Sequence, residues 1–224
     1  MRRALLTVCI GLLAHVTPLQ AQDVGRYYSQ EDLAGASSRM SPNLRGLWEE
    51  DFLTRLTPDE RIRAGAVTLN LPLVGAQRKP LEFYASPTDR QVYLPIASVK
   101  FLDDVNIAIA HYERHGCGIG AISDYMGVLR VRPAELSGTP RQILGLPANV
   151  LSDPIVDDLS QKLTKSTVFF IVAHEFAHVM YGHRGYREIN ELEAQRQETE
   201  ADAFALDVMR RMGVEPRTLA HLLM

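Results

Sequence analysis

The sequence predicts an α+β fold in which a small sheet packs on two long helices. Residues 67–73 alternate between apolar and polar side chains, and residues 81–85 and 91–96 form two further strand-like runs. Residues 159–181 and 190–212 carry apolar side chains at helical spacing, over lengths typical of helices rather than strands.

The composition is that of a globular domain. The chain has 224 residues, of which 46% are hydrophobic and 23% charged, which excludes fibrous, collagen-like and mostly disordered proteins. The 24 Lys and Arg residues do not exceed the 27 Asp and Glu residues, so we expect no nucleic-acid partner. Two cysteines cannot build a multi-disulfide scaffold.

Residues 1–21 have the pattern of a secretory signal peptide. Arg2 and Arg3 give a positive start, an apolar run covers residues 4–14, and the small Ala21 precedes the expected cut. This run is too short to cross a bilayer. We therefore expect cleavage before Gln22 and a periplasmic or secreted protein. Retention of the segment as a membrane anchor is the alternative.

The first part of the mature chain is expected to be an N-terminal arm, residues 22–65, with loose packing over the Gly- and Ser-containing residues 23–48. Within it, Thr57 and Pro58 are a cap and a first residue typical of a short helix. The main domain is expected to follow over residues 66–224.

The main domain begins with the predicted strands. Pro72 lacks an amide hydrogen and so favours an edge position for residues 67–73. The turn residues 86–89 predict that the next two strands form a hairpin.

The predicted helices follow the strands. Ser98 is expected to cap a helix that ends at Gly116, and residues 117–154 are expected to be loop-rich with a strand over 128–132. The two long helices come next, and Pro216 is expected to open a last short helix.

The first long helix contains His174-Glu175-Phe176-Ala177-His178, an HExxH motif. Residues four apart lie on one face of a helix, so both imidazoles can reach one Zn²⁺. Glu175 lies beside them, where a general base would activate water. The apolar residues 168–173 before the motif would exclude solvent from the site.

The second long helix supplies the third expected ligand, because a catalytic zinc site needs three protein ligands. Glu198 and Asp202 share a helical face, and Ala201, Ala203 and Ala205 are expected to let the two helices approach closely. We expect Glu198 to bind the metal. Asp202 is expected to accept a hydrogen bond from the outer nitrogen of a histidine ligand.

The segments HEFAHVMYGH and ETEADAFALDVMRRMGVEPRTL resemble the gluzincin zinc metallopeptidases. They are most similar to the family of the membrane protease HtpX, the periplasmic protease BepA and the CAAX prenyl protease. The resemblance covers residues 166–224, is weak over 81–116 and fails over 22–80. It implies a gluzincin core, one Zn²⁺ per chain, a glutamate as third ligand and a supporting aspartate.

The function that follows is an exported zinc metalloendopeptidase acting on peptides or unfolded proteins. Zn²⁺ would polarise the scissile carbonyl and activate water, and Glu175 would carry its proton to the leaving amine. Residues 91–96, as an edge strand, are expected to hold an extended substrate. Any association with the cell envelope is expected to be peripheral. The candidates for stabilising the oxyanion are Tyr181, His183, Tyr186 and His221.

Two alternatives stay open at this level. One is a binding or chaperone-like module that uses the fold without catalysis, against which the intact Glu175 argues. The other is a latent protease whose residues 22–60 cover the cleft.

The remaining metal-binding residue types have simpler interpretations. His183 is expected to be a helix-end residue, Glu200 to be solvated, and His111 and His115 to lie on a helix surface. Cys117 is expected to be structural. A deformylase-like site that uses Cys117 as a ligand is a weaker alternative.

Overall fold

The computed structural model describes residues 23–186 and 188–213. The expected signal peptide, the expected helix after Pro216 and His221 lie outside this range. The fold is mixed α+β and mostly helical, with one three-stranded sheet. The helices are α1 Gln30–Gly46, α2 Pro58–Ala64, α3 Ile96–Arg114, α4 Gly120–Val131, α5 Pro140–Ile143, α6 Pro154–Tyr181 and α7 Glu191–Arg211. The strands are β1 Thr68–Asn70, β2 Tyr84–Ser86 and β3 Gln91–Tyr93, and the 3₁₀ and π turns are η1 Val24–Arg26, η2 Leu47–Phe52, η3 Leu53–Arg55, η4 Pro133–Glu135 and η5 Val150–Ser152.

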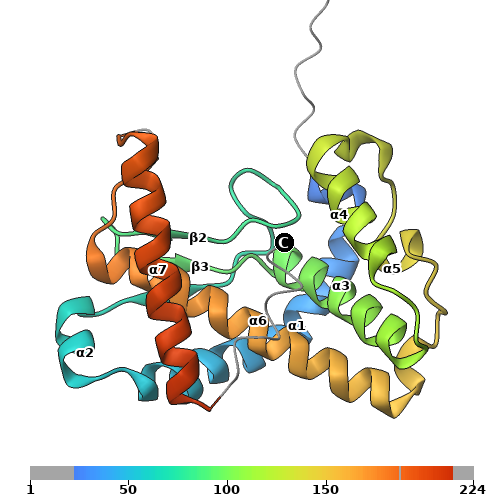
Figure 1. The fold of residues 1–224 in the computed structure, drawn as a ribbon, viewed down its shortest axis with the longest axis horizontal. Helices are drawn as coiled ribbons and strands as arrows, with labels where there is room; N and C mark the ends of the chain where they lie inside the picture. Colours follow the sequence, from blue (N-terminus) through green and yellow to red (C-terminus); the bar gives the residue numbers. More distant parts are fainter. Residues whose placement is uncertain (1–22, 187, 214–224) are drawn as a thin grey trace, which may run out of the picture.

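The long helix α6 is the centre of the fold (Figure 1). It contacts α2, α3, α7, η2, η5, β2 and β3. Asp153 caps its first turn and Pro154 opens it, while Gly182 ends it in the left-handed conformation at φ 65°. Because α6 is packed on several sides, its position and that of its side chains are strongly constrained.

The sheet has the strand order β1-β3-β2, with β1 parallel and β2 antiparallel to β3. The predicted hairpin and the edge position of the first strand are therefore confirmed. The expectation that residues 91–96 form an edge strand is wrong, because β3 is the central strand and the two edges are β1 and β2.

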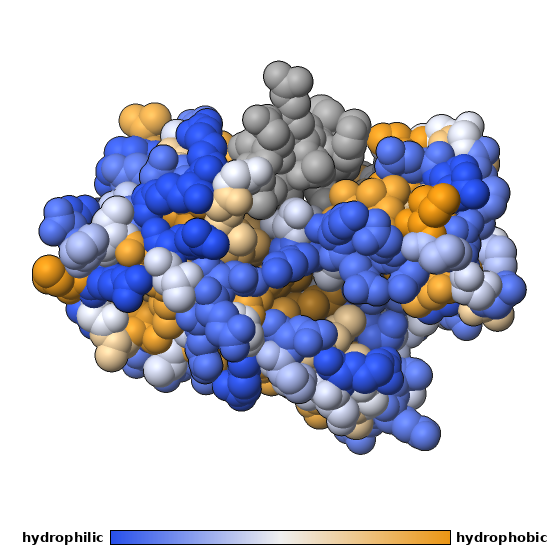
Figure 2. All heavy atoms as spheres, turned by 90° about the horizontal axis from the view of Figure 1, so that it is seen from below, coloured by the Kyte–Doolittle hydropathy of each residue, from blue (hydrophilic) through white to orange (hydrophobic). Residues whose placement is uncertain are grey.

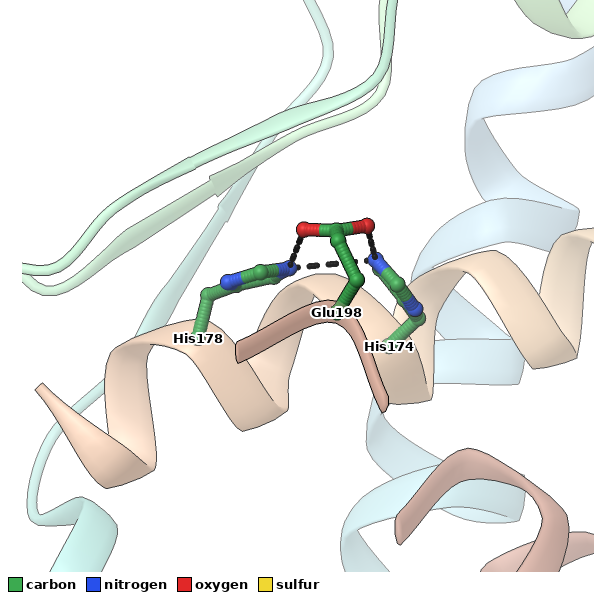
Figure 3. A group of neighbouring side chains, drawn as sticks. All are labelled: His174, His178 and Glu198. Atoms are coloured by element: carbon green, nitrogen blue, oxygen red, sulfur yellow. Dashed lines mark hydrogen bonds and ion pairs between the residues drawn. The ribbon is translucent and has the colours of Figure 1, made fainter. Parts of the chain in front are cut away.

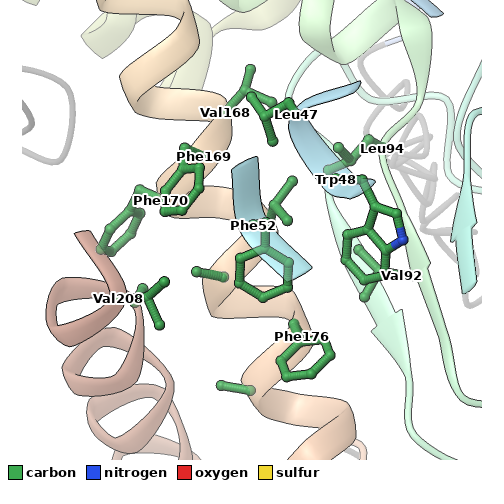
Figure 4. Packing of buried hydrophobic residues seen from close by; sticks show 14 of the residues in the cluster. Leu47, Trp48, Phe52, Val92, Leu94, Val168, Phe169, Phe170, Phe176 and Val208 are labelled. Carbon is green, nitrogen blue, oxygen red and sulfur yellow. The ribbon is translucent and has the colours of Figure 1, made fainter. Parts of the chain in front are cut away.

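The segment before the sheet is part of the core, so the expectation of loose packing over 23–48 is wrong. The Ser29 and Asp32 side chains form a reciprocal cap that starts α1. Trp48 and Phe52 from η2 are buried against α6, with the Phe52 ring centroid 5.0 Å from that of Phe176 (Figure 4). Aromatic pairs of this kind contribute about 0.5–1.5 kcal/mol beyond their burial.

The region after the hairpin contains two further differences. The helix expected to begin at Ser98 begins at Ile96, and the buried Ser98 hydroxyl accepts a hydrogen bond from the Glu82 amide instead. The strand expected over 128–132 is the end of helix α4, whose buried Ile122, Tyr125 and Leu129 pack at helical spacing. The short helix capped by Thr57 is confirmed as α2.

The surface is mostly polar where it is visible in Figure 2, and apolar atoms appear there in small separate patches. Within residues 23–186 and 188–213, none of the helices combines the length and the apolar character that a membrane span requires.

Candidate metal centre

The HExxH motif lies in the last two turns of α6. His174 and His178 are one turn apart, and their side chains are only 16% and 13% exposed. The intervening Phe176 and Ala177 face the core, with 1% and 0% exposure. The amphipathic pattern of the motif therefore turns both imidazoles to one side of the helix, while the other side anchors it.

Helix α7 packs along α6 and supplies Glu198. Ala201 and Ala205 are fully buried at this interface, as are Ala173 and Ala177 on α6, so small side chains permit the close approach. Ala203, expected to share this role, is exposed and lies outside the interface.

The three side chains meet at one point (Figure 3). His174 Nε2 and His178 Nε2 are 3.1 Å apart, and the two Glu198 oxygens lie 3.4 Å and 3.3 Å from these nitrogens. Within the part of the chain that the structure describes, this is the one group of three His, Cys, Asp or Glu residues whose ligand atoms converge. The group could bind a metal ion.

The outer nitrogens of the two histidines have different partners. His174 Nδ1 lies 2.8 Å from Asp202 Oδ1, the contact that the ExxxD spacing predicts. His178 Nδ1 lies 2.9 Å from Nδ1 of His183, whose Nε2 is 3.2 Å from Glu200 Oε2.

These contacts bear on two expectations. His183 lies just beyond the end of α6, as a helix-end residue should, but its side chain is buried against His178. Glu200, expected to be solvated, is partly exposed and contacts both His183 and Arg196. The sequence signal for the His183 contact is Gly182, which turns the chain back at the end of α6.

The pKa values of the three side chains in the group are shifted from their ordinary values. Hydrogen bonding to His174 is the main cause that lowers the pKa of Glu198 to about 2. Burial, followed by the neighbouring His174, lowers the pKa of His178 to about 4. Burial alone would also lower the pKa of His174, but Glu198, Glu175 and Asp202 together raise it.

Glu175 lies next to the three-residue group. Burial raises its pKa to about 7, and the nearby Glu198 charge adds to this effect while His174 opposes it. A carboxyl group whose pKa lies near neutrality can both accept and donate a proton at neutral pH, as a general base and acid must.

An apolar cavity of about 430 Å³ opens beside the group. His174, Glu175, Glu198 and Asp202 line one side. The remaining lining is mostly apolar and comes from the residues just before β2 and from α3, α4 and α6. These residues are Leu81, Phe83, Phe101, Leu102, Val105, Met126, Thr167, Phe170 and Ile171. No residue of the described segment 23–60 is among those that line this cavity. A larger cavity of about 920 Å³, between η2 and α6, contains none of the predicted site residues.

The other candidate site residues differ in whether they contact the three-residue group. The Tyr186 hydroxyl donates to Glu198 Oε1 at 2.5 Å, so it touches one of the converging ligand atoms. Tyr181 instead stacks on His183, with ring centroids 5.5 Å apart. Cys117 is exposed and does not belong to the convergent group, which removes the ligand on which a deformylase-like site depends.

Comparison with known proteins gives one match. Residues 148–214, less than a third of the chain, match the profile of the family Peptidase U49, and they contain α6 and α7 with the whole three-residue group. No curated protein and no solved structure matches the chain. The match supports a peptidase, and the narrower resemblance to the HtpX group stays a prediction.

Proposed function

We propose that this protein is an exported zinc-dependent endopeptidase with a gluzincin-like arrangement of ligands. The observation that carries the proposal is the convergence of His174, His178 and Glu198 beside Glu175, next to an apolar cavity. The match of the same segment to a peptidase family supports it.

The geometry of the three side chains fits Zn²⁺. Zinc bonds of about 2.0–2.1 Å in a tetrahedron place neighbouring ligand atoms roughly 3.3 Å apart. The three separations in the group are 3.1, 3.3 and 3.4 Å. Two imidazoles and one carboxylate are also the donor set of known catalytic zinc sites, in which a fourth position stays open to water or substrate.

A zinc ion in this position would act as a Lewis acid and would lower the pKa of a water molecule. In the proposed reaction, Glu175 accepts the proton of the attacking water and delivers it to the leaving amine. A neighbouring dication would lower the pKa of Glu175 from its metal-free value of about 7, which favours the carboxylate that accepts the proton.

The proposed substrates are extended peptides that carry an apolar side chain next to the cleaved bond. The cavity beside His174 is the natural place for such a side chain, since most of its lining is apolar. Strand β2 is a sheet edge and packs on α6, so we propose that it, rather than β3, pairs with the substrate backbone.

Digestion of casein or a peptide library by the full chain tests this function. We expect cleavage by the zinc-loaded protein, loss of cleavage after chelation, and recovery when Zn²⁺ is added back. Mapped cleavage sites should show apolar side chains next to the cut. Cleavage that is unchanged after complete metal removal would contradict the proposal, and zinc-loaded protein that cleaves nothing would favour a binding module.

We further propose that residues 1–21 direct export and are removed. The positive start followed by an apolar run supports this proposal. Mass spectrometry of the protein from a bacterial envelope fraction should give an N-terminus near Gln22. An intact Met1 in a cytoplasmic pool would contradict it.

A further inference from the structure

We propose that His183 and Glu200 are a positioning pair that sets the tautomer of His178 for metal binding. The inference rests on the proposed function, because it assigns a partner to one of the three proposed zinc ligands. It gives the second histidine of HExxH a support that the sequence motif does not contain.

The end of helix α6 brings His183 to His178. Gly182 adopts φ 65°, and the His183 amide then donates to the His178 carbonyl at 3.0 Å. This six-to-one hydrogen bond is the Schellman turn, which places the second residue beyond a helix against its last turn. The side chains follow the backbone, so His183 Nδ1 lies 2.9 Å from His178 Nδ1.

Packing holds the His183 ring in this place. Its side chain is only 4% exposed. The Tyr181 ring stacks on it with an interplanar angle of 29°, and the His178 ring meets it at 76°. A buried imidazole held in this way has little freedom to exchange partners, so the contacts of its two nitrogens are fixed.

Glu200 then determines which nitrogen of each ring carries hydrogen. A carboxylate can only accept, so His183 Nε2 must be the donor to Glu200 Oε2, 3.2 Å away. When both imidazoles are neutral, His183 Nδ1 is thereby an acceptor and His178 Nδ1 donates to it. This leaves His178 Nε2 without hydrogen, and Nε2 is the atom that faces His174 and Glu198. Arg196 Nη1 holds Glu200 from the other side at 2.7 Å through Oε1.

The pair differs from the support of His174, which contacts the Asp202 carboxylate directly. The Asp202 side chain is 54% exposed, whereas His183 is buried. The two proposed histidine ligands of HExxH therefore have different hydrogen-bond partners. Each partner can be substituted without altering the other.

The first test is the zinc affinity of full-length variants, measured by competition with a chromophoric chelator. Loss of an outer partner of a metal-bound histidine typically weakens binding by about 10–100-fold. We expect such a loss in His183→Phe, which keeps a ring but accepts no hydrogen bond. His183→Gln retains a carbonyl acceptor and should recover most of the affinity. The matched control Glu191→Gln, an exposed acid at the start of α7, should bind zinc as the wild type does.

Imidazole ¹⁵N NMR of the metal-free protein gives a readout that does not depend on zinc. We expect His178 in the wild type to show hydrogen on Nδ1. Glu200→Gln should convert it to a mixture of tautomers, because an amide can donate as well as accept. Glu200 is 43% exposed in its side chain, so this variant should fold, and it serves if His183→Phe does not.

The outcomes separate the inference from the proposed function. The positioning pair would be overturned if folded His183→Phe or Glu200→Gln kept both the zinc affinity and the His178 tautomer of the wild type. An equal loss in His183→Gln and His183→Phe would show that the acceptor is not what matters, and would overturn it as well. Wild-type protein that shows the expected tautomer yet binds no zinc would leave the pair intact and defeat the proposed function.

Discussion

Replacement of Glu175 by glutamine is expected to reduce peptide hydrolysis by roughly 10²–10⁴-fold, the usual contribution of a positioned general base. The amide has nearly the size and shape of the carboxylate but cannot accept a proton from the attacking water. The proposed ligands His174, His178 and Glu198 are untouched, so bound zinc should remain. Initial rates on a fluorogenic peptide, with zinc measured on the same sample, check both statements.

The matched control for this change is Glu191→Gln, which removes the same charge from an exposed position on α7. Its hydrolysis should equal that of the wild type. Full activity in Glu175→Gln would mean that another group acts as the base, or that a contaminating protease is responsible.

The second large effect is expected for His174→Ala. Removing one of three protein ligands leaves a site that no longer meets the requirement of catalytic zinc, so bound metal should fall from about one per chain to background. Hydrolysis should be lost with it. The control is His115→Ala. His115 also belongs to a pair of histidines four residues apart, and its ring centroid lies 4.3 Å from that of His111, but neither belongs to the convergent group.

Elemental analysis of the two purified variants, after dialysis against metal-free buffer, decides this prediction. Equal zinc in His174→Ala and wild type would show that the metal is bound elsewhere. Loss of zinc in His115→Ala would point to the α3 histidines instead.

The parts of the site that are local in sequence could be predicted from it. His174 and His178 share a helical face because of the periodicity of a single helix, and the same holds for Glu198 and Asp202. The close approach of α6 and α7 could be inferred from the alanines of α7. Of the three alanines expected at this interface, Ala201 and Ala205 are buried there and Ala203 is exposed.

The His183–Glu200 pair could not be obtained by helical spacing, because Gly182 ends the helix between His178 and His183. Helical spacing continued past Gly182 gives a wrong position for His183, because the chain is no longer helical there. A Schellman turn was needed to predict the contact, and the Gly-His sequence at the end of the helix contained the signal for it.

The fold could be predicted where a strand or helix has a clear hydrophobic periodicity and is bounded by recognisable turn or cap residues. Helix α1 has few apolar residues and contains Pro42, so its stability comes from tertiary burial of Leu33 and Leu44 and from the cap at Ser29. Helix α4 ends in a run of β-branched and apolar residues that also fits a strand, and only its burial on α3 decides between the two.

Zinc X-ray absorption spectroscopy on the full-length wild-type protein tests the ligand set most directly. The account predicts about one zinc per chain, with only nitrogen and oxygen neighbours at about 2.0–2.1 Å and the multiple-scattering signature of two imidazoles. A sulfur neighbour at about 2.3 Å would assign Cys117 to the metal and contradict the site built from His174, His178 and Glu198. A protein that takes up no zinc under the same conditions would contradict it equally.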